Sequence, residues 1–439
     1  YGGADRYAFP AVCEGPCYFR VPITYSAQCH MLETRWMKDP SIARGSILNF
    51  VQNQLKSGSF PGHVYPNWVQ KDGFYHANWG RAVLELNRVH PDEGFLNKVY
   101  HALSRYAEYF DRERDRENSG LYDVINQFET GQEYMSRYMA VGSNSDSGGW
   151  GEKFRLKGVD ATVYMYELKQ ALQGIADKLG ILEDSYGWKS GADRIKNALL
   201  EIMWDPEAEI FSDVDPSSGR RTGIKAAVSF YPYMTDIVDE SHLTGLKRHL
   251  FNPEEFWTPY PVPSTSLDDS YFSEYGEWKG KRHNCPWNGR VWPMTNSHIA
   301  EVLAGCALRF NDDELKNRAV DFIERFIRMM FFNSDVRRPN SFEHYNPFTG
   351  KPSIYRGVDD YQHSWIVDLI IKYVAGVIPM DGVVVVEPFP FELEWLKLED
   401  VIVAGKNFKI EREESKFRVW VDGELKGEKH IGAKMVFHI

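Results

Sequence analysis

The chain has 439 residues, of which 43% are hydrophobic, so it can bury a large core in one big domain or in several smaller ones. Its formal net charge of −11, without an evident basic patch, excludes nucleic acids and anionic membrane surfaces as expected partners. No apolar run is long enough to span a membrane, and no secretory signal is evident. The chain begins at Tyr1 rather than Met, which indicates that a leading segment has been removed and leaves the compartment open.

The cysteines predict reduced thiols rather than a disulfide framework, because there are five of them, an odd number. Cys13 and Cys17 are nevertheless close enough in sequence to pair. No cluster of Cys and His has the ligand spacing of a zinc site. We therefore expect neither a metal nor an organic cofactor, and the oligomeric state stays open.

Helical periodicity recurs along the chain in pairs that are joined by short, often acidic turns. Residues 1–22 lack this period and are interpreted as an extended lead-in. The expected helices lie at about 23–37, 40–58, 76–90, 93–113, 158–178, 184–204, 223–236, 239–250, 291–309, 313–332 and 360–375. Such a series predicts an all-α (α/α)6 toroid whose inner helices line a central pocket. Eleven helices leave one of the twelve unassigned.

After Pro379 the pattern changes to short β-branched or alternating runs at 383–386, 401–403 and 417–421. The pair Asp422-Gly423 is a hairpin turn signal that follows the third run. We therefore expect two domains. A helical catalytic domain covers 1–379, and a small all-β appendage at 380–439 packs on it.

Three long stretches interrupt the helical rhythm, at 114–157, 251–289 and 333–359. Loops of this length are uncommon in a compact domain unless they are functional. Glu133 lies in the first stretch and Glu343 in the third, 210 residues later (343 minus 133). Two carboxylates brought together from distant segments are what glycosidic bond cleavage needs, one to protonate the leaving oxygen and one to activate water or to attack.

Glu133 has neighbours that suit an acid catalyst. Gly131 permits unusual backbone torsions, and Tyr134 can desolvate the carboxylate and raise its pKa. Arg137 lies four residues further, within reach of Glu133 or of a substrate hydroxyl. The alternative is an exposed helix face on which Glu129, Glu133 and Arg137 form i,i+4 ion pairs.

Glu343 begins a Glu-His-Tyr-Asn-Pro run, in which His344 follows directly. A rigid aromatic loop that ends in Pro can hold a carboxylate facing water, as a general base requires. The alternative is a solvated Glu in a surface turn.

The segment 285–293 places Trp287, Arg290 and Trp292 around a glycine just before an apolar helix. Indole faces stack on sugar rings, and guanidinium groups donate hydrogen bonds to hydroxyls. An equally plain interpretation is a helix entry held by aromatic packing. Asp160, at the start of another helix, is either an N-cap or a ligand of sugar hydroxyls.

Several of these segments resemble motifs of trehalases and of glycoside hydrolase family 63. The segment 129–138 is similar to the signature Glu-Ser-Gly-Trp-Asp-Phe-Ser-Ser-Arg-Trp, in which the Asp is the general acid. The segment 285–296 is similar to the Trp-Arg-Gly-Pro-Val-Trp-Pro motif. The segment 342–350 is similar to Tyr-Glu-x-Tyr-x-Pro-x-Thr-Gly, whose Glu is the general base. Segments 159–161 and 257–269 follow in the expected order, and the similarity spans roughly residues 24 to 375.

The resemblance implies an inverting glycosidase on an (α/α)6 barrel that cleaves an α-glucoside or α-mannoside in the exo mode. Glu133, one methylene longer than the family's Asp, would be the acid and Glu343 the base. The residues expected to hold the sugar are Gln132, Tyr134, Arg137, Asp160, Trp287, Arg290, Trp292 and His344. The family's Trp-Asp motif is not evident at 24–26, and the β segment is not a standard feature.

Two other functions stay open. The first is a sugar epimerase or isomerase on the same barrel, in which histidines move protons; the candidates are His30, His76, His298 and His363. The second is a carbohydrate-binding protein that has lost catalysis, which the Glu in place of Asp at position 133 motivates.

Overall fold

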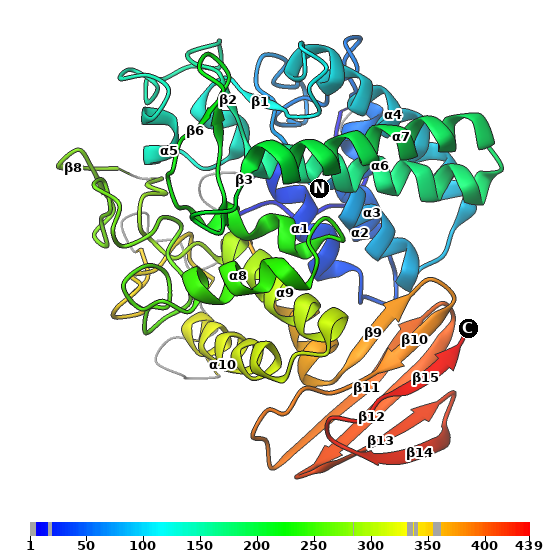
Figure 1. Ribbon diagram of the computed structural model, residues 1–439. Coiled ribbons are helices and arrows are strands. Elements are labelled where there is room, and N and C mark those ends of the chain that lie inside the picture. Colours follow the sequence, from blue (N-terminus) through cyan, green and yellow to red (C-terminus); the bar gives the residue numbers. More distant parts are fainter. Residues whose placement is uncertain (1–5, 16–19, 284, 332–336, 338–340, 354–360) are drawn as a thin grey trace.

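The computed structural model describes residues 6–15, 20–283, 285–331, 337, 341–353 and 361–439 (Figure 1). Helices dominate this chain as far as residue 374, and strands dominate the remainder. The α-helices are α1 Thr24–Thr34, α2 Ser41–Gln52, α3 Trp79–Val89, α4 Glu93–Arg114, α5 Ser136–Met139, α6 Val159–Leu179, α7 Leu182–Ala198, α8 Leu243–Leu250, α9 Pro293–Phe310, α10 Asp313–Met330 and α11 Ile366–Leu369.

Shorter helical turns and small strands connect these helices. The 3₁₀ turns are η1 Gln127–Thr130, η3 Ala227–Met234 and η4 Glu240–His242, and the π turns are η2 Leu199–Met203 and η6 Ile370–Val374. The small strands are β1 Asp123–Val124, β2 Leu156–Lys157, β3 Trp204–Asp205, β4 Ile210–Phe211, β5 Val214–Asp215, β6 Arg220–Arg221, β7 Glu277–Trp278 and β8 Lys281–Arg282.

The helices divide into two kinds according to their burial. α1, α6 and α9 are buried around most of their circumference, so they lie inside the body. α10 instead buries a stripe that includes Leu315, Ala319, Phe322, Ile323 and Phe326, at the spacing of a helix with one face toward the core. Each of α1, α3, α6 and α9 is followed directly by a partner helix, namely α2, α4, α7 and α10.

The inner elements contact one another in sequence. α1 contacts α3, α3 contacts α6, α6 contacts η3, η3 contacts α9, and α9 contacts α11. α11 in turn contacts α1, so the series returns to its start. These contacts bring together elements that lie more than 300 residues apart in the chain.

Most of the expected helices are confirmed, with three differences. The helix expected at 223–236 is the 3₁₀ turn η3, which contains Pro232, a residue that cannot donate an α-helical hydrogen bond. The helix expected at 184–204 ends in the π turn η2, and the chain becomes a strand at Trp204. The last expected helix begins only at Ile366, and its expected start at residue 360 lies outside the described residues. Cys17, the possible disulfide partner of Cys13, also lies outside them.

The C-terminal part of the chain forms two antiparallel sheets, as the β-branched runs predict. One has the order β15-β10-β9 and the other β11-β12-β13-β14. Their bounds are β9 Val377–Met380, β10 Val383–Val386, β11 Trp395–Val403, β12 Lys406–Glu413, β13 Lys416–Val421, β14 Glu424–His430 and β15 Met435–His438. Asp422 and Gly423 both have positive φ, 52° and 83°, which makes the predicted two-residue hairpin between β13 and β14.

The strands lie at one side of the helical body, where orange and red segments meet α3 and α9 in the view of Figure 1. They have a hydrophobic core of their own, separate from the large core of the helices. α3 contacts β9 and β11, and the side chain of Trp36 from the helical part packs against the second core. β9 runs across the expected boundary between residues 379 and 380. None of the described helices is both long and apolar enough to cross a membrane.

A cluster of buried charges lies where α1, α3 and α11 meet. Arg35 is fully buried and donates hydrogen bonds to Asp368 (2.6 Å) and to Glu85 (2.5 Å). Glu33, two residues before Arg35, accepts the backbone N–H of Val367 at 2.9 Å. Burial, and then the nearby Asp368, raise the pKa of Glu33 from 4.5 to about 8.

The raised pKa of Glu33 predicts a stability that falls with pH. The folded chain holds a proton that the unfolded chain releases near pH 4.5, so the free energy of unfolding decreases as pH rises from about 4.5 to about 8. Glu33→Gln keeps the acceptor oxygen and does not ionise. We expect the loss of Tm between about pH 5 and pH 8 to be smaller in this variant by about 1–3 °C, measured by calorimetry. Glu108→Gln, at an exposed position of α4, is the control and keeps the wild-type slope; equal slopes for all three proteins would contradict the prediction.

Candidate active site

The segment that carries Glu133 is shaped by two residues with positive φ. η1 ends at Gly131, with φ of 65°, where a Cβ atom would lie 2.5 Å from the ring of Tyr25, so no side chain fits. Tyr134 also has a positive φ, 58°, and its N–H donates to Oε1 of Gln127 at 2.9 Å. Glu133 lies between these two turns and is partly exposed. Gln132 is buried and donates from Nε2 to the hydroxyl of Tyr25 at 3.4 Å.

Arg137 fixes the end of this segment from inside the protein. Its guanidinium has no exposed area and donates to both oxygens of Asp160 (2.9 and 2.8 Å) and to both oxygens of Asp213 (2.7 and 2.8 Å). Asp213 also accepts the N–H of Val159, the first residue of α6. Although both carboxyls are buried, Arg137 holds the pKa of Asp160 below its usual value, while burial keeps the pKa of Asp213 above it.

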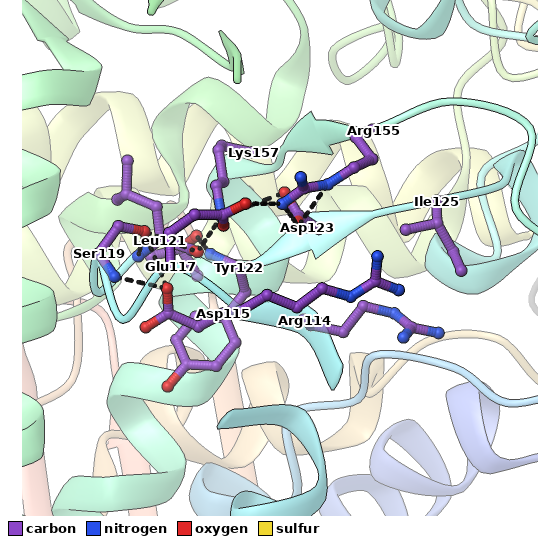
Figure 2. Close-up of polar contacts among 12 residues, drawn as sticks. Arg114, Asp115, Glu117, Ser119, Leu121, Tyr122, Asp123, Ile125, Arg155 and Lys157 are labelled. Atoms are coloured by element: carbon purple, nitrogen blue, oxygen red, sulfur yellow. Dashed lines mark hydrogen bonds and ion pairs between the residues drawn. The ribbon is translucent and has the colours of Figure 1, made fainter. Parts of the chain in front are cut away.

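Arg137 and Asp160 therefore use their charged groups on each other rather than presenting them to a sugar. The alternative of an exposed face with i,i+4 pairs does not describe the segment either, because Glu129 is buried and pairs with Arg114 at 2.6 Å. The loop before it is anchored by a second cluster, in which Asp123 of β1 contacts Lys157 of β2 and Arg155 just before that strand (Figure 2). The segment with Glu133 thus lies on a rigid base.

Glu343 is held by the opposite part of the chain. Tyr345 and Val291 exchange two backbone hydrogen bonds of 2.9 Å, which place the 341–346 segment beside the entry of α9. His344 is buried and its Nδ1 accepts from Nε of Arg290 at 2.9 Å. Glu343 has only 5% of its surface exposed, and the thiol of Cys285 lies 3.3 Å from its Oε1.

The segments that carry Glu133 and Glu343 both contact the segment 285–287. The carbonyl of Glu133 accepts the N–H of Trp287 at 3.0 Å, and Cys285, two residues earlier, contacts Glu343. Burial and then Glu133 raise the pKa of Tyr75, whereas burial, Glu14 and Glu343 raise that of Tyr361. Cys285 also contributes to both shifts.

Aromatic rings enclose this region. Trp287 and Trp292 are both buried and stack at 3.8 Å with an interplanar angle of 8°. The ring of His344 lies 4.9 Å from that of Trp292. Tyr134 lies on the other side, where its ring is 4.2 Å from that of His283. Rings that exclude water strengthen the electrostatic interactions of the carboxylates between them.

The structure thus brings together Gln132, Glu133, Tyr134, Trp287, Arg290, Trp292, Glu343 and His344. It places Arg137 and Asp160 behind them. Sequence reasoning missed Asp213, Cys285 and the tyrosines 25, 75 and 361. Asp213 lies just before β5 in a segment that matches no motif. Whether a single Tyr or Cys belongs to a site depends on which distant segment packs against it, and the local sequence does not show that.

Two of the histidines expected for an epimerase, His30 and His298, are poor proton carriers here. Burial lowers the pKa of His30 to about 4 and that of His298 to about 3. His298 donates or accepts hydrogen bonds with Met294 (2.9 Å) and Tyr164 (3.2 Å), as a packed core histidine does. His76 lies against the buried Glu129 at 3.7 Å. A base with so low a pKa as that of His30 or His298 is weak near neutral pH.

Comparison with known proteins gives a family. A family model of the mannosylglycerate hydrolase MGH1-like glycoside hydrolase domain matches residues 23–364, more than three quarters of the chain. The chain belongs to this family. The matched range ends just before α11 and contains both candidate carboxylates.

The MGH1-like chain also has curated relatives that it matches in part. It is 26% identical over 153 residues to a probable mannosyl-oligosaccharide glucosidase of Schizosaccharomyces pombe, covering 33% of this chain and 18% of that protein. It is 23% identical over 217 residues to an uncharacterized protein of Borreliella burgdorferi, covering 46% of this chain and 42% of that one. The chain thus spans less than half the length of either relative.

Solved structures share its fold. A mannosylglycerate hydrolase from Thermus thermophilus, crystallised in complex with Tris, aligns with a TM-score of 0.66 at 15% identity, covering 82% of this chain and 95% of that one. A chain described as a sialidase aligns with a TM-score of 0.76 at 18% identity, covering 94% of this chain and 36% of that one. At these identities the likeness concerns the fold.

The contact between Cys285 and Glu343 predicts a pH effect. A thiol that donates to a carboxylate favours its ionised form. We expect Cys285→Ala to move the acidic limb of the pH profile of kcat/KM toward higher pH, and Cys285→Ser, which keeps a donor, to stay close to wild type. The measurement is the pH dependence of hydrolysis of an active aryl glycoside. A Cys306→Ala variant, at a buried cysteine that contacts the carbonyl of Tyr233, serves as the control. Identical acidic limbs in the Ala and Ser variants at position 285 would contradict the prediction.

Proposed function

We propose that this MGH1-like chain is an exo-acting, inverting α-glycosidase that cleaves an α-glucoside or an α-mannoside. The observation that carries the proposal is the junction at 285–287. There the N–H of Trp287 donates to the backbone carbonyl of Glu133, and the thiol of Cys285 contacts the carboxylate of Glu343. Carboxylates from two distant segments, enclosed by rings, are the groups that hydrolysis of a glycosidic bond requires. The family and the names of a glucosidase and a mannosylglycerate hydrolase among its relatives support the substrate class.

In this mechanism Glu133 is the general acid and Glu343 the general base. Glu133 is partly exposed in the loop between the two positive-φ residues Gly131 and Tyr134, where it can reach the oxygen of a leaving group. Glu343 is nearly buried and receives the Cys285 contact, which favours a carboxylate that is ready to accept a proton from water. Inversion requires a separation of about 6.5–9.5 Å between the two carboxyl groups, to leave room for that water.

The remaining residues have supporting roles in this proposal. Arg290 and the stacked pair Trp287 and Trp292 would hold the sugar together with Gln132, Tyr134 and His344. Arg137 and Asp160, whose charges are satisfied internally, act as positioning residues that keep Glu133 in place. Removing one partner of such a buried pair leaves an uncompensated charge and costs about 3–5 kcal/mol.

The architecture that we propose is an (α/α)6 toroid over residues 1–379, with the strands of 380–439 as a β appendage. The closed series of contacts from α1 through α3, α6, η3, α9 and α11 supports an inner ring. α2, α4, α7 and α10 follow the inner helices and would form the outer ring. A toroid filled by its own side chains at one end leaves a pocket with one mouth, which suits exo cleavage.

The stereochemistry of the product tests the mechanism. With α-glucosides and α-mannosides that carry a non-sugar leaving group, proton NMR of the first product should show the β-anomer of the released sugar, because water attacks from the face opposite the leaving group. Trehalose should give one β-glucose and one α-glucose, because its leaving glucose keeps the α configuration. The α-anomer as first product from an α-glucoside or α-mannoside would refute inversion.

The carboxylates themselves are tested by isosteric variants. Glu133→Gln and Glu343→Gln should each reduce kcat by about 10²–10⁴-fold, since each removes a group that transfers a proton in the transition state. Glu277→Gln, at an exposed carboxylate of β7 in the same region, is the matched control and should retain wild-type kcat. Full activity of either first variant would sink its assignment, and wild-type sugar binding without any turnover would instead favour a carbohydrate-binding protein.

A further inference from the structure

One buried polar side chain is not explained by the mechanism above. His363 has 3% of its surface exposed, and neither of its ring nitrogens has a hydrogen-bond partner among the residues that the structure describes. Four aromatic rings surround it, with centroid distances of 5.7 Å to Tyr25, 5.7 Å to Tyr361, 6.3 Å to Trp287 and 6.3 Å to Trp292. A buried imidazole costs free energy unless its nitrogens are satisfied, so such a group in a native protein calls for a reason.

The other histidines that were candidates for proton transfer differ from His363. His298 makes hydrogen bonds at both nitrogens, and Nε2 of His30 contacts the carbonyl of Gln362 at 2.9 Å. Nε2 of His76 lies 3.7 Å from the carboxylate of Glu129, which is an ion-pair contact, although neither nitrogen of His76 has a hydrogen-bond partner among the described residues. Each of these three rings therefore has at least one polar contact with the chain. The ring of His363 packs in the aromatic cluster, whereas neither of its nitrogens has a partner among the described residues.

Backbone contacts place His363 near both segments that carry the candidate catalytic carboxylates. The N–H of Tyr361, two residues before it, donates to the carbonyl of Ser341, two residues before Glu343. Trp287 in the same ring cluster donates its backbone N–H to the carbonyl of Glu133. The indole N–H of Trp287 also lacks a partner within the described part of the chain. Two buried polar side chains without a partner among the described residues thus lie together at the segment 285–287, which contacts both the segment of Glu133 and that of Glu343.

We propose that His363, together with the indole N–H of Trp287, is a hydroxyl-binding position for the sugar ring that is cleaved. The inference rests on the proposed function and deepens it, because it names the residues that read the hydroxyls of the glycosyl unit. A sugar hydroxyl can donate and accept at once, so it satisfies either type of nitrogen.

The protonation of His363 fits recognition rather than proton transfer. Burial, and then the neighbouring His30 and His298, lower the pKa of His363 to about 3, so the ring is neutral near neutral pH. A neutral imidazole offers one donor and one acceptor, and the indole adds a second donor. The site is therefore built for two or three hydroxyl contacts without a charge that would compete with the carboxylates.

His363→Phe separates a binding role from a structural one. Phe has a similar size and no polar atoms, so the sugar-free variant should keep or raise its Tm, because an unsatisfied buried group has been removed. At the same time kcat/KM should fall about tenfold or more, and His363→Gln, which keeps a donor and an acceptor, should recover part of it. His298→Phe is the matched control: its nitrogens are satisfied within the fold, so the same change there should lower Tm. A lower Tm for His363→Phe with unchanged kcat/KM would make His363 a structural residue.

Binding in an inactive background keeps this test independent of turnover. Calorimetry of Glu133→Gln with D-glucose and D-mannose should show binding of at least one sugar, and adding His363→Phe should weaken it about tenfold or more. The loss should be smaller for a monodeoxy sugar that lacks a hydroxyl contacted by His363 than for the other monodeoxy sugars. Equal affinities with and without His363, an equal loss for every deoxy sugar, or no sugar binding at all would overturn the inference. Should wild type hydrolyse no glycoside while binding still depends on His363, the proposed function fails and this site stands.

Discussion

The buried contact of Arg137 with Asp160 and Asp213 is the interaction on which the rest of the site depends. It joins three parts of the chain, namely the segment that carries Glu133, the first turn of α6 and the strand region before β5. One guanidinium compensates two carboxylates in a buried region, where a missing partner is expensive. The backbone around Glu133 is therefore anchored from inside the protein.

A second constraint comes from the junction at 285–287, which belongs neither to the segment of Glu133 nor to that of Glu343. Its backbone and its thiol contact one segment each. The packing of Trp287 on Trp292 makes this junction stiff, since two fully buried indoles cannot move independently. A rigid segment that contacts both loops helps to hold them at a constant separation.

Burial of polar groups has two opposite effects on the stability of this site. Arg137, Asp160 and Asp213 satisfy one another, so their burial adds rigidity. His363 is buried without a partner among the described residues, so its burial is a cost to the folded chain. Proteins accept such a cost where a ligand recovers it, which is why unsatisfied polar groups gather at sites of recognition. The sheets β9–β15 have a separate core at the side of the body near α3 and contribute none of these residues.

The sequence determined the elements of this protein well and its polar contacts poorly. Periodicity was enough to predict α3, α4, α6, α9 and α10, because each buries a face, or nearly its whole surface, against the body. It failed for η3, where Pro232 breaks the helical hydrogen bonding although the apolar pattern continues. The motifs around Glu133 and Glu343 indicated two carboxylates of one site, since residues that act together in a reaction leave local signatures in both segments.

Only the tertiary structure decided the partners of these side chains. Arg137 has the same sequence neighbours whether it faces a sugar or two buried carboxylates, and Asp213, which decides the matter, lies 76 residues away. Cys285 and His363 are ordinary residues in the sequence. They gain their meaning from contacts between segments, 58 residues apart for Cys285 and Glu343. Local sequence specifies backbone preference and burial, whereas the charge and hydrogen-bond partners of a buried group depend on which distant segment packs beside it.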